Sequence, residues 1–298
     1  MFVRSGTHFY DEPYFSILLD TYAYYGRFEM NPNLKEKYQS LIKKLEKYGS
    51  IAIEFSGGVD STFLAKVAFE VLGEKTLAIT VDSEAYPPEN IIECRKLAAQ
   101  IGIKLIEIKE NVCDIPEFSA NPPERCYYCK KALFTLMLKK AEEEGIKFLS
   151  DGSNINDLDD YRPGKRALDE LNIKSPLRDL GFTKNDIRAV SKDLGLPTWN
   201  RQSFACLASR FPYGSQITPD LLEKTWKAES ILRNLGIKYY RVRNHGDIAR
   251  IELDPEGMNI VMDKPTREKV VSHIKSLGYK YITLDLQGYR TGSMNEVL

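Results

Sequence analysis

A glycine-rich segment with the composition of an anion-binding turn follows the first strongly apolar run of the chain. It reads Ser-Gly-Gly-Val-Asp-Ser, from Ser56 to Ser61, and leads into an apolar helical stretch. Gly57 and Gly58 allow a sharp turn and leave no side chain in the way of an anion. The first N–H groups of the helix then face that anion, and the two serines add hydroxyl donors. Asp60 would repel a phosphate unless Mg²⁺ lay between them, so the segment predicts a site for nucleotide phosphates and Mg²⁺.

Three of the five cysteines form a second candidate site. Cys126 and Cys129 are a Cys-x-x-Cys pair at the expected start of a helix, and thiolates at that spacing can bind one metal ion or cluster. Cys206 is the expected third ligand, because it lies between two predicted domains, where clefts often form. Three thiolates would hold a [4Fe-4S] cluster and leave one iron open to a ligand such as sulfide, whereas zinc with a water is the competing metal site. Cys94 and Cys113 are expected to be buried apolar side chains.

Strand-like and helix-like segments alternate through the first two thirds of the chain. The expected strands are Ile51–Phe55, Leu77–Val81, Leu105–Ile108 and Phe148–Ser150, and the expected helices include Pro88–Gln100, Lys131–Glu144 and Thr183–Leu194. This alternation predicts an α/β fold, a parallel sheet sandwiched by helices. Ligands of such sheets bind at the carboxyl ends of the strands. Asp82 and Ser83 follow the second strand and Gly152 follows the fourth, so they are expected beside the glycine-rich turn.

The pattern changes after about Arg201 to helix, strand, strand, helix, strand. The expected elements are a helix at Pro219–Leu235, strands at Tyr239–Arg243 and Ile248–Leu253, a helix at Thr266–Leu277 and a strand at Tyr281–Leu286. This order predicts a smaller α+β domain. We therefore expect an N-terminal extension at 1–34, an ATP-binding domain at 35–205 and a small α+β substrate or assembly domain at 206–298.

Composition narrows the class of protein. Lys plus Arg equal Asp plus Glu at 42 each, so the net charge is zero and a nucleic-acid partner is not expected. Hydrophobic residues make up 43% of the chain, which supports a substantial core. No apolar run approaches the ~18 residues of a membrane span, and the start lacks the pattern of a signal peptide. We therefore expect a cytoplasmic protein without a membrane partner.

The glycine-rich segment lacks the Gly-Lys-Ser/Thr of kinases and GTPases, and it resembles the PP-loop of N-type ATP pyrophosphatases. Within that superfamily the chain resembles the LarE family, and specifically its cluster-bearing branch. The resemblance rests on Ser56–Ser61, Val81–Pro88, Asn121–Lys130, Asp151–Gly164, Cys206–Gly214 and Tyr240–Arg243. It implies an adenine nucleotide alpha hydrolase-like fold for the larger domain.

The resemblance also implies a reaction. ATP would adenylate a carboxylate of pyridinium-3,5-biscarboxylic acid mononucleotide, and sulfur would displace AMP to give a thiocarboxylate, twice per molecule. The product belongs to the biosynthesis of the nickel-pincer cofactor of lactate racemase. ATP, Mg²⁺ and a [4Fe-4S] cluster are the implied cofactors, and the implied partners are sulfide or another sulfur donor and further copies of the chain.

Site roles follow the resemblance and the strand pattern. Cys206, Asp60 and Arg210 are the expected catalytic residues, with Arg210 placed to meet a phosphate or the adenylate. Arg241 and Arg243 alternate on one strand, so both point to the same face and could clamp the phosphate of the substrate. The cysteine trio indicates sulfide on a cluster as the sulfur source, and sacrifice of the Cys206 sulfur is the alternative. An iron–sulfur tRNA thiolase, an amide-forming synthetase of the NAD or GMP type and a non-catalytic ATP-binding module are the rival functions.

Overall fold

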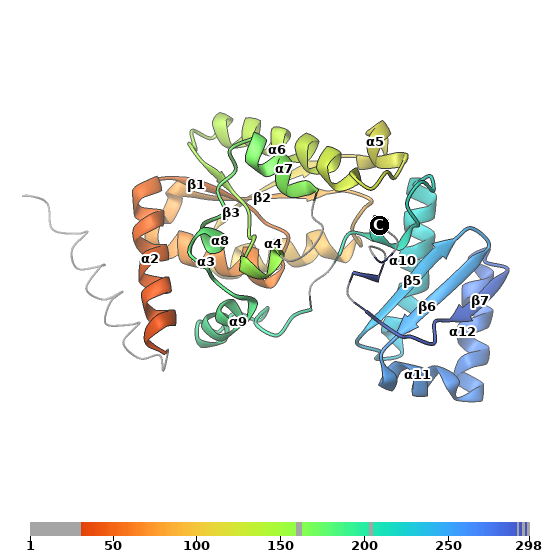
Figure 1. The fold of residues 1–298 in the computed structure, drawn as a ribbon. Helices are drawn as coiled ribbons and strands as arrows, with labels where there is room; N and C mark the ends of the chain where they lie inside the picture. The colour runs from red at the N-terminus through yellow and green to blue at the C-terminus, as the bar shows by residue number, and fades with distance from the viewer. Residues whose placement is uncertain (1–30, 159–162, 203–204, 291, 294–295, 297–298) are drawn as a thin grey trace, which may run out of the picture.

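A computed structural model describes residues 31–158, 163–202, 205–290, 292–293 and 296 (Figure 1). Its larger part contains a four-stranded parallel sheet in the order β3-β2-β1-β4. The strands are β1 (Ile51–Glu54), β2 (Thr76–Asp82), β3 (Lys104–Lys109) and β4 (Leu149–Ser150). The predicted α/β fold, a parallel sheet between helices, is confirmed.

Helices cover both faces of this sheet because the side chains of each strand alternate between the faces. Ile53 and Phe55 belong to one buried cluster, and Ala52 belongs to the other. The first cluster is covered by α2 (Pro32–Tyr48), α3 (Val59–Leu72), α4 (Glu89–Ile101), α8 (Pro176–Asp179) and α9 (Lys184–Asp193). The second is covered by α5 (Pro116–Ser119), α6 (Arg125–Glu143), α7 (Gly164–Glu170) and the segment Leu207–Leu222. Four short 3₁₀ turns occur among the described residues: η1 (Gly73–Lys75), η2 (Val112–Asp114), η3 (Ile155–Leu158) and η4 (Leu207–Arg210).

The strand order reverses at the centre of this sheet. From β1 the chain proceeds to β2 and β3 on one side, and β4 then pairs with β1 on the other side. The carboxyl ends of β1 and β4 therefore flank a topological switch point, the usual position of a ligand in open α/β sheets.

A second, three-stranded sheet lies beside the first (Figure 1). Strand β5 (Tyr240–His245) is antiparallel to β6 (Ile248–Leu253), which is parallel to β7 (Tyr281–Leu284). Its helices are α10 (Pro219–Asn234), α11 (Pro255–Met262) and α12 (Lys264–Ser276). Helix α10 connects the two parts, since Leu222 packs in a core cluster of the larger sheet and Leu232 packs in the core of the smaller one.

The elements differ from expectation in three places. Helix α6 begins at Arg125 rather than Lys131, so Cys126 and Cys129 lie inside its first two turns. Helix α2 and helix α11 were not anticipated, and most of the predicted N-terminal extension lies outside the described residues.

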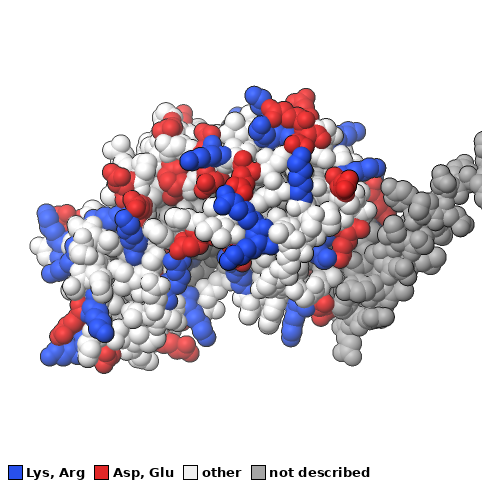
Figure 2. All heavy atoms as spheres, turned by 180° about the vertical axis from the view of Figure 1, so that it is seen from behind, with Lys and Arg blue, Asp and Glu red and all other residues white. Residues whose placement is uncertain are grey.

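The distribution of charge on the surface agrees with the net charge of zero. Figure 2 shows basic and acidic side chains interspersed over the face it displays. Within the described segments, no helix is long and apolar enough to cross a membrane.

Candidate functional site

The glycine-rich loop joins β1 to α3 and forms an open helix N-terminus. Gly57 has a φ of +70°, a left-handed conformation that favours glycine. Gly58 is the extended N-cap of α3, and no side chain caps this helix. The first N–H groups of α3 are therefore available to an anion, and the hydroxyl oxygens of Ser56 and Ser61 lie 3.1 Å apart beside them. This is the geometry that the sequence predicted for a phosphate site.

The loop after β4 packs directly on this helix N-terminus. A Cβ added at Gly152 would lie 3.0 Å from the backbone nitrogen of Ser61 and 3.2 Å from the Cβ of Asp60. Only glycine allows such a close approach, so the structure brings Gly152 against the loop as expected from its place after β4. The neighbouring Asp151 is buried and accepts a 2.6 Å hydrogen bond from the hydroxyl of Ser175, which fixes this part of the switch point.

Asp60 has one engaged and one orphaned carboxylate oxygen. Its Oδ2 accepts a 2.5 Å hydrogen bond from the ammonium group of Lys184, at the first position of α9. Its Oδ1 is buried and has no hydrogen-bond partner within the described part of the chain. Burial raises the pKa of the Asp60 carboxyl, and the Lys184 ammonium opposes that shift. An unpaired buried carboxylate oxygen beside a phosphate cradle suits a Mg²⁺ ion, which prefers oxygen ligands.

Two cations near the loop were missed at the sequence level. Lys184 reaches Asp60 as described, and Arg201 donates a 3.1 Å hydrogen bond to the carbonyl of Gly57. Arg201 also lies 3.4 Å from Glu93 on α4. Both come from segments far along the chain, so no local motif marks them.

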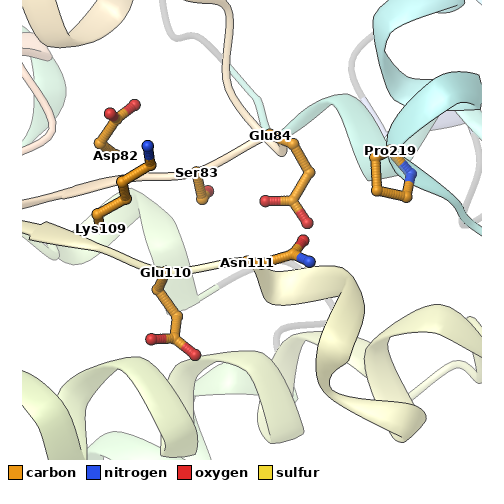
Figure 3. Close-up of a pocket in the computed structure, with 7 residues that line it drawn as sticks. All are labelled: Asp82, Ser83, Glu84, Lys109, Glu110, Asn111 and Pro219. Atoms are coloured by element: carbon orange, nitrogen blue, oxygen red, sulfur yellow. The ribbon is translucent and has the colours of Figure 1, made fainter.

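Asp82 and Ser83 lie at the end of β2 and line a cavity of about 380 Å³. Its other lining residues are Glu84, Lys109, Glu110, Asn111 and Pro219 (Figure 3). The hydroxyl of Ser83 is buried and has no hydrogen-bond partner among the described residues. Glu84 is already engaged, because its carboxylate accepts a 2.7 Å hydrogen bond from the N–H of Cys113. One hydroxyl without a partner among the described residues thus lies at the carboxyl edge of the sheet.

Hydrogen bonds to backbone carbonyls connect the segment of Cys206 with the end of β2 and with the helix that carries the Cys-x-x-Cys pair. The N–H of Leu207 donates to the carbonyl of Ala85 at 2.9 Å, just after β2. The guanidinium of Arg125, at the start of α6, donates to the carbonyl of Ala208 at 3.1 Å. The side-chain amide of Asn121 adds a further contact, because it donates to the carbonyl of Pro212 at 2.7 Å.

The three thiols of this region share one electrostatic environment. Burial raises the pKa of the Cys129 thiol, and the charges of Cys206 and Cys126 raise it further. Burial also raises the pKa of Cys206, while the cation Arg125 acts in the opposite direction. The structure therefore brings Cys126, Cys129 and Cys206 close enough to influence one another. Without a metal the thiols of Cys129 and Cys206 hold their protons, and metal binding would have to displace them.

The arrangement is not that of a single-ion site. No three His, Cys, Asp or Glu side chains in the described ranges are grouped closely enough to hold one metal ion. The ligands of an iron–sulfur cluster bind different irons, so their sulfurs lie farther apart than the ligands of one ion. Three soft thiols are a donor set that both zinc and an iron–sulfur cluster accept, so the cluster stays a prediction.

Two further titratable side chains belong to this edge of the sheet, Tyr86 after β2 and Glu54 at the end of β1. Burial raises the pKa of the Tyr86 hydroxyl, and the charges of Cys206, Glu54, Cys129 and Cys126 raise it further. Burial raises the pKa of Glu54 to about 7, Lys130 opposes the shift, and Asp151 and Asp60 add to it. Glu54 was not singled out from the sequence, although a lone acid in a buried strand next to the loop was a signal for it.

Arg210 is enclosed by the protein. Its guanidinium is fully buried and pairs with Glu229 on α10 through bonds of 2.9 and 3.0 Å. It also donates to the carbonyl of Cys206 at 3.2 Å and to that of Ala205 at 2.9 Å. These contacts fix the backbone that carries Cys206, so the visible contribution of Arg210 is positional, and its expected contact with a phosphate or the adenylate stays a prediction.

The two predicted clamp arginines differ in their partners. Arg243 pairs with the buried Glu252 through bonds of 3.0 and 2.8 Å and donates to the carbonyl of Ser209 at 2.8 Å. Arg241 lies 5.0 Å from the ring centre of Tyr289 and donates to its hydroxyl at 3.2 Å. No ion pair of Arg241 occurs within the described segments. Burial lowers the pKa of Arg241 and the nearby Arg210 acts in the same direction, so this guanidinium would gain from an added anion.

Comparison with known proteins extends over nearly the whole chain. Residues 33–121 match the NAD synthase family. The chain is 40% identical over 265 residues to an uncharacterised protein of Synechocystis sp., covering 89% of this chain and 99% of that protein. It is 36% identical over 269 residues to the pyridinium-3,5-bisthiocarboxylic acid mononucleotide synthase of Lactiplantibacillus plantarum, covering 89% and 96% of the two chains. An uncharacterised protein of Methanocaldococcus jannaschii is 32% identical over 263 residues, covering 88% of this chain and 96% of that protein.

Proposed function

Because the chain belongs to the LarE family of PP-loop enzymes, we propose that it converts the carboxylates of pyridinium-3,5-biscarboxylic acid mononucleotide into thiocarboxylates in an ATP-dependent reaction. The observation that carries the proposal is the connection between an open helix N-terminus and three thiols. The N–H of Leu207 donates to the carbonyl of Ala85 after β2, and Arg125 at the start of α6 donates to the carbonyl of Ala208. The segments of the thiols therefore lie at the carboxyl edge of the sheet, which also carries the glycine-rich loop. An activated acid and a sulfur nucleophile can therefore meet in one region.

ATP activates the acid in the first half of the reaction. A carboxylate is a poor electrophile because its leaving group would be oxide, and a mixed anhydride with AMP supplies a better one. The N–H groups of α3 and the hydroxyls of Ser56 and Ser61 would hold the departing pyrophosphate. Asp60 would hold Mg²⁺ through its orphaned Oδ1, and Lys184 would lie beside the phosphates.

Sulfur replaces AMP in the second half. Cys126, Cys129 and Cys206 would hold a [4Fe-4S] cluster, which supplies an iron with an open position for sulfide when it is bound. Arg210 and Arg125 position the chain around Cys206 through its backbone carbonyls. Arg241 would bind the phosphate of the substrate, because no acidic side chain pairs with its guanidinium in the described segments.

The proposal assigns the two halves of the reaction to different parts of the chain. Residues 35–205 would bind ATP, and residues 206–298 would supply Cys206 and the arginines that face the substrate. This division describes function and not packing, because Leu207–Leu222 belong to the second proposed part but pack into the core of the larger sheet.

The test is product formation by protein purified without oxygen. With ATP, Mg²⁺, sulfide and the biscarboxylic acid mononucleotide we expect pyrophosphate and AMP release and a product in which sulfur has replaced oxygen by mass. Iron and sulfide analysis should give about four of each per chain. Alanine at all three of Cys126, Cys129 and Cys206 should abolish iron and thiocarboxylate, whereas Cys113→Ala should retain both. Pyrophosphate release that does not depend on the mononucleotide, or full activity of the triple variant, would contradict the proposal.

A further inference from the structure

Arg201 reaches the glycine-rich loop from the segment that follows α9. Its guanidinium donates a 3.1 Å hydrogen bond to the carbonyl of Gly57 and lies 3.4 Å from the carboxylate of Glu93 on α4. The backbone of Arg201 is anchored independently of these contacts. Its N–H donates to the carbonyl of Thr198 at 2.9 Å, and its carbonyl accepts from Arg188 on α9 at 2.8 Å. The guanidinium is therefore presented to the loop from a fixed backbone.

The carbonyl of Gly57 depends on this one donor. Arg201 donates to it, and no second donor to it occurs among the described residues. The next carbonyl differs, because that of Gly58 accepts from the N–H of Thr62 at 3.1 Å and so belongs to the hydrogen bonding of α3. Helix α4 packs against the loop, where a Cβ added at Gly57 would lie 3.1 Å from the Sγ atom of Cys94. The peptide between Gly57 and Gly58 is thus the part of the loop whose orientation depends on Arg201.

Peptide geometry determines what this hydrogen bond does. The peptide bonds of the described residues are trans, so the carbonyl of Gly57 and the N–H of Gly58 point in opposite directions. With the carbonyl turned to Arg201, the N–H of Gly58 points away from Arg201, and it has no acceptor within the described part of the chain. A peptide between two glycines rotates easily, because neither neighbour has a Cβ that restricts it. Rotation by half a turn would direct the carbonyl oxygen to where the N–H now points, and an oxygen there would repel a phosphate.

We propose that Arg201 is a positioning residue, which holds the peptide between Gly57 and Gly58 with its N–H toward the pyrophosphate part of ATP. This inference rests on the ATP-binding half of the proposed function. Arg201 acts through the backbone of the loop, and Glu93 holds its guanidinium beside the Gly57 carbonyl. Its role differs from that of Lys184, whose ammonium group contacts the carboxylate of Asp60.

The test measures, by calorimetry, how the wild-type protein and Arg201→Ala bind pyrophosphate with Mg²⁺ and how they bind AMP. The N–H of Gly58 would contact a phosphate of the pyrophosphate group, which AMP lacks. Loss of one hydrogen bond to a charged group lowers affinity by on the order of 10- to 100-fold. We expect Arg201→Ala to lose pyrophosphate affinity by about that factor and to bind AMP as the wild type does. The KM for ATP should rise in this variant, and the KM for the mononucleotide should not change.

Two further variants separate this role from general stability. Arg201→Lys keeps a cation with hydrogen-bond donors, so its pyrophosphate affinity should lie between those of Arg201→Ala and the wild type. Arg95→Ala removes another partly exposed arginine, which pairs with Glu107 of β3 through bonds of 2.7 and 2.6 Å instead of with the loop. It should bind both ligands as the wild type does. The melting temperatures of Arg201→Ala and Arg95→Ala should be similar, because each variant loses one partly exposed ion pair.

The binding data and the product assay fail independently. Equal pyrophosphate affinity in Arg201→Ala and the wild type would overturn the inference, and the proposed function would stand if the wild type still forms thiocarboxylate. Equal losses of pyrophosphate and AMP affinity would also overturn it, because a general distortion of the site would explain both. If the wild type forms no thiocarboxylate while Arg201→Ala selectively loses pyrophosphate affinity, the proposed function fails and the role of Arg201 stands. A wild type that binds no pyrophosphate would overturn both.

Discussion

A substitution at Gly152 tests how tightly the loop after β4 must pack against the proposed phosphate site. A Cβ at this position would meet the backbone nitrogen of Ser61 at 3.0 Å, closer than the loop can accept without moving. Gly152→Ala should therefore displace the N–H of Ser61, one of the groups proposed to bind pyrophosphate. We expect the KM for ATP to rise and pyrophosphate release to fall by on the order of 100-fold, as small misplacements at reacting centres do. Steady-state pyrophosphate release at several ATP concentrations measures this.

Gly195→Ala is the matched control for that substitution. Gly195 has a φ of +67° and nothing within 4 Å of an added Cβ, so alanine there strains the backbone without touching the site. It should cost about 1 kcal/mol of stability and leave the KM for ATP unchanged. An ATP dependence that shifts equally in both variants would mean that Gly152 acts through general stability and not through the loop.

Among individual residues, the sequence identified those that lie next to one another in a motif. It did not identify contacts between residues that are far apart in the sequence. Ser56 and Gly57 follow one another in a turn whose geometry is set by neighbouring residues, and the structure reproduces it. Lys184 reaches Asp60 from 124 residues away, and this contact depends on the packing of α9. The partner of Arg210 was equally invisible, because Glu229 comes from a helix of the smaller part.

At the element scale, helix α9 links a capping motif to the nucleotide site. The hydroxyl of Thr183 accepts a hydrogen bond from the N–H of Asp186, and the Asp186 carboxylate accepts one from the N–H of Thr183. Lys184 follows directly and reaches Asp60. Thr183→Ala should cost about 1 kcal/mol and loosen the first turn that holds Lys184. We expect a lower melting temperature and a higher KM for ATP in the same variant.

Asp263→Ala separates the two effects. Asp263 caps α12 by accepting a hydrogen bond from the N–H of Thr266, and α12 packs in the core of the smaller sheet. This variant should lose similar stability and keep the KM for ATP. If Thr183→Ala lowers the melting temperature with no change in ATP dependence, the position of Lys184 does not depend on the cap.

Sequence patterns predicted the strands of the larger sheet better than the helices, since the 17-residue α2 and the shorter α11 were both missed. Each strand of the larger sheet was located to within a residue or two at its ends, because short apolar runs between polar loops are typical of buried strands. Helix α11 was missed although Asp254 and Pro255 form a regular helix start, since its short length carries little periodicity. The start of α6 was placed too late because its first turn contains polar and cysteine residues that show no apolar spacing.

At the scale of the whole molecule, buried ion pairs join the Cys206 segment to the smaller sheet. Arg210 is fully buried and Glu229 is 4% exposed, so neither charge has water as an alternative partner. Glu229→Gln would leave the Arg210 cation uncompensated and should cost about 3–5 kcal/mol in urea unfolding. The control Glu223→Gln removes the exposed partner of Lys227 on the same helix and should cost less than about 1 kcal/mol. Equal losses in the two variants would contradict a structural role for the buried pair.

The source of the sulfur decides whether one chain can form more than one thiocarboxylate. A chain that surrenders the sulfur of Cys206 can make no more than one thiocarboxylate, and its mass must fall by the lost sulfur. A chain that transfers external sulfide keeps Cys206 and continues as long as sulfide and ATP last. The raised pKa of Cys206 disfavours its free thiolate as the donor at neutral pH, because burial holds the thiol protonated.

We therefore expect anaerobic protein supplied with excess sulfide to make several thiocarboxylates per chain while the intact mass of the polypeptide stays constant. Product quantified against protein, together with the intact mass before and after reaction, measures both. Isotopically labelled sulfide should appear in every product molecule. Product that stops at one thiocarboxylate per chain, carries no label and accompanies a loss of mass at Cys206 would establish the sacrificial route and remove the need for the cluster in sulfur transfer.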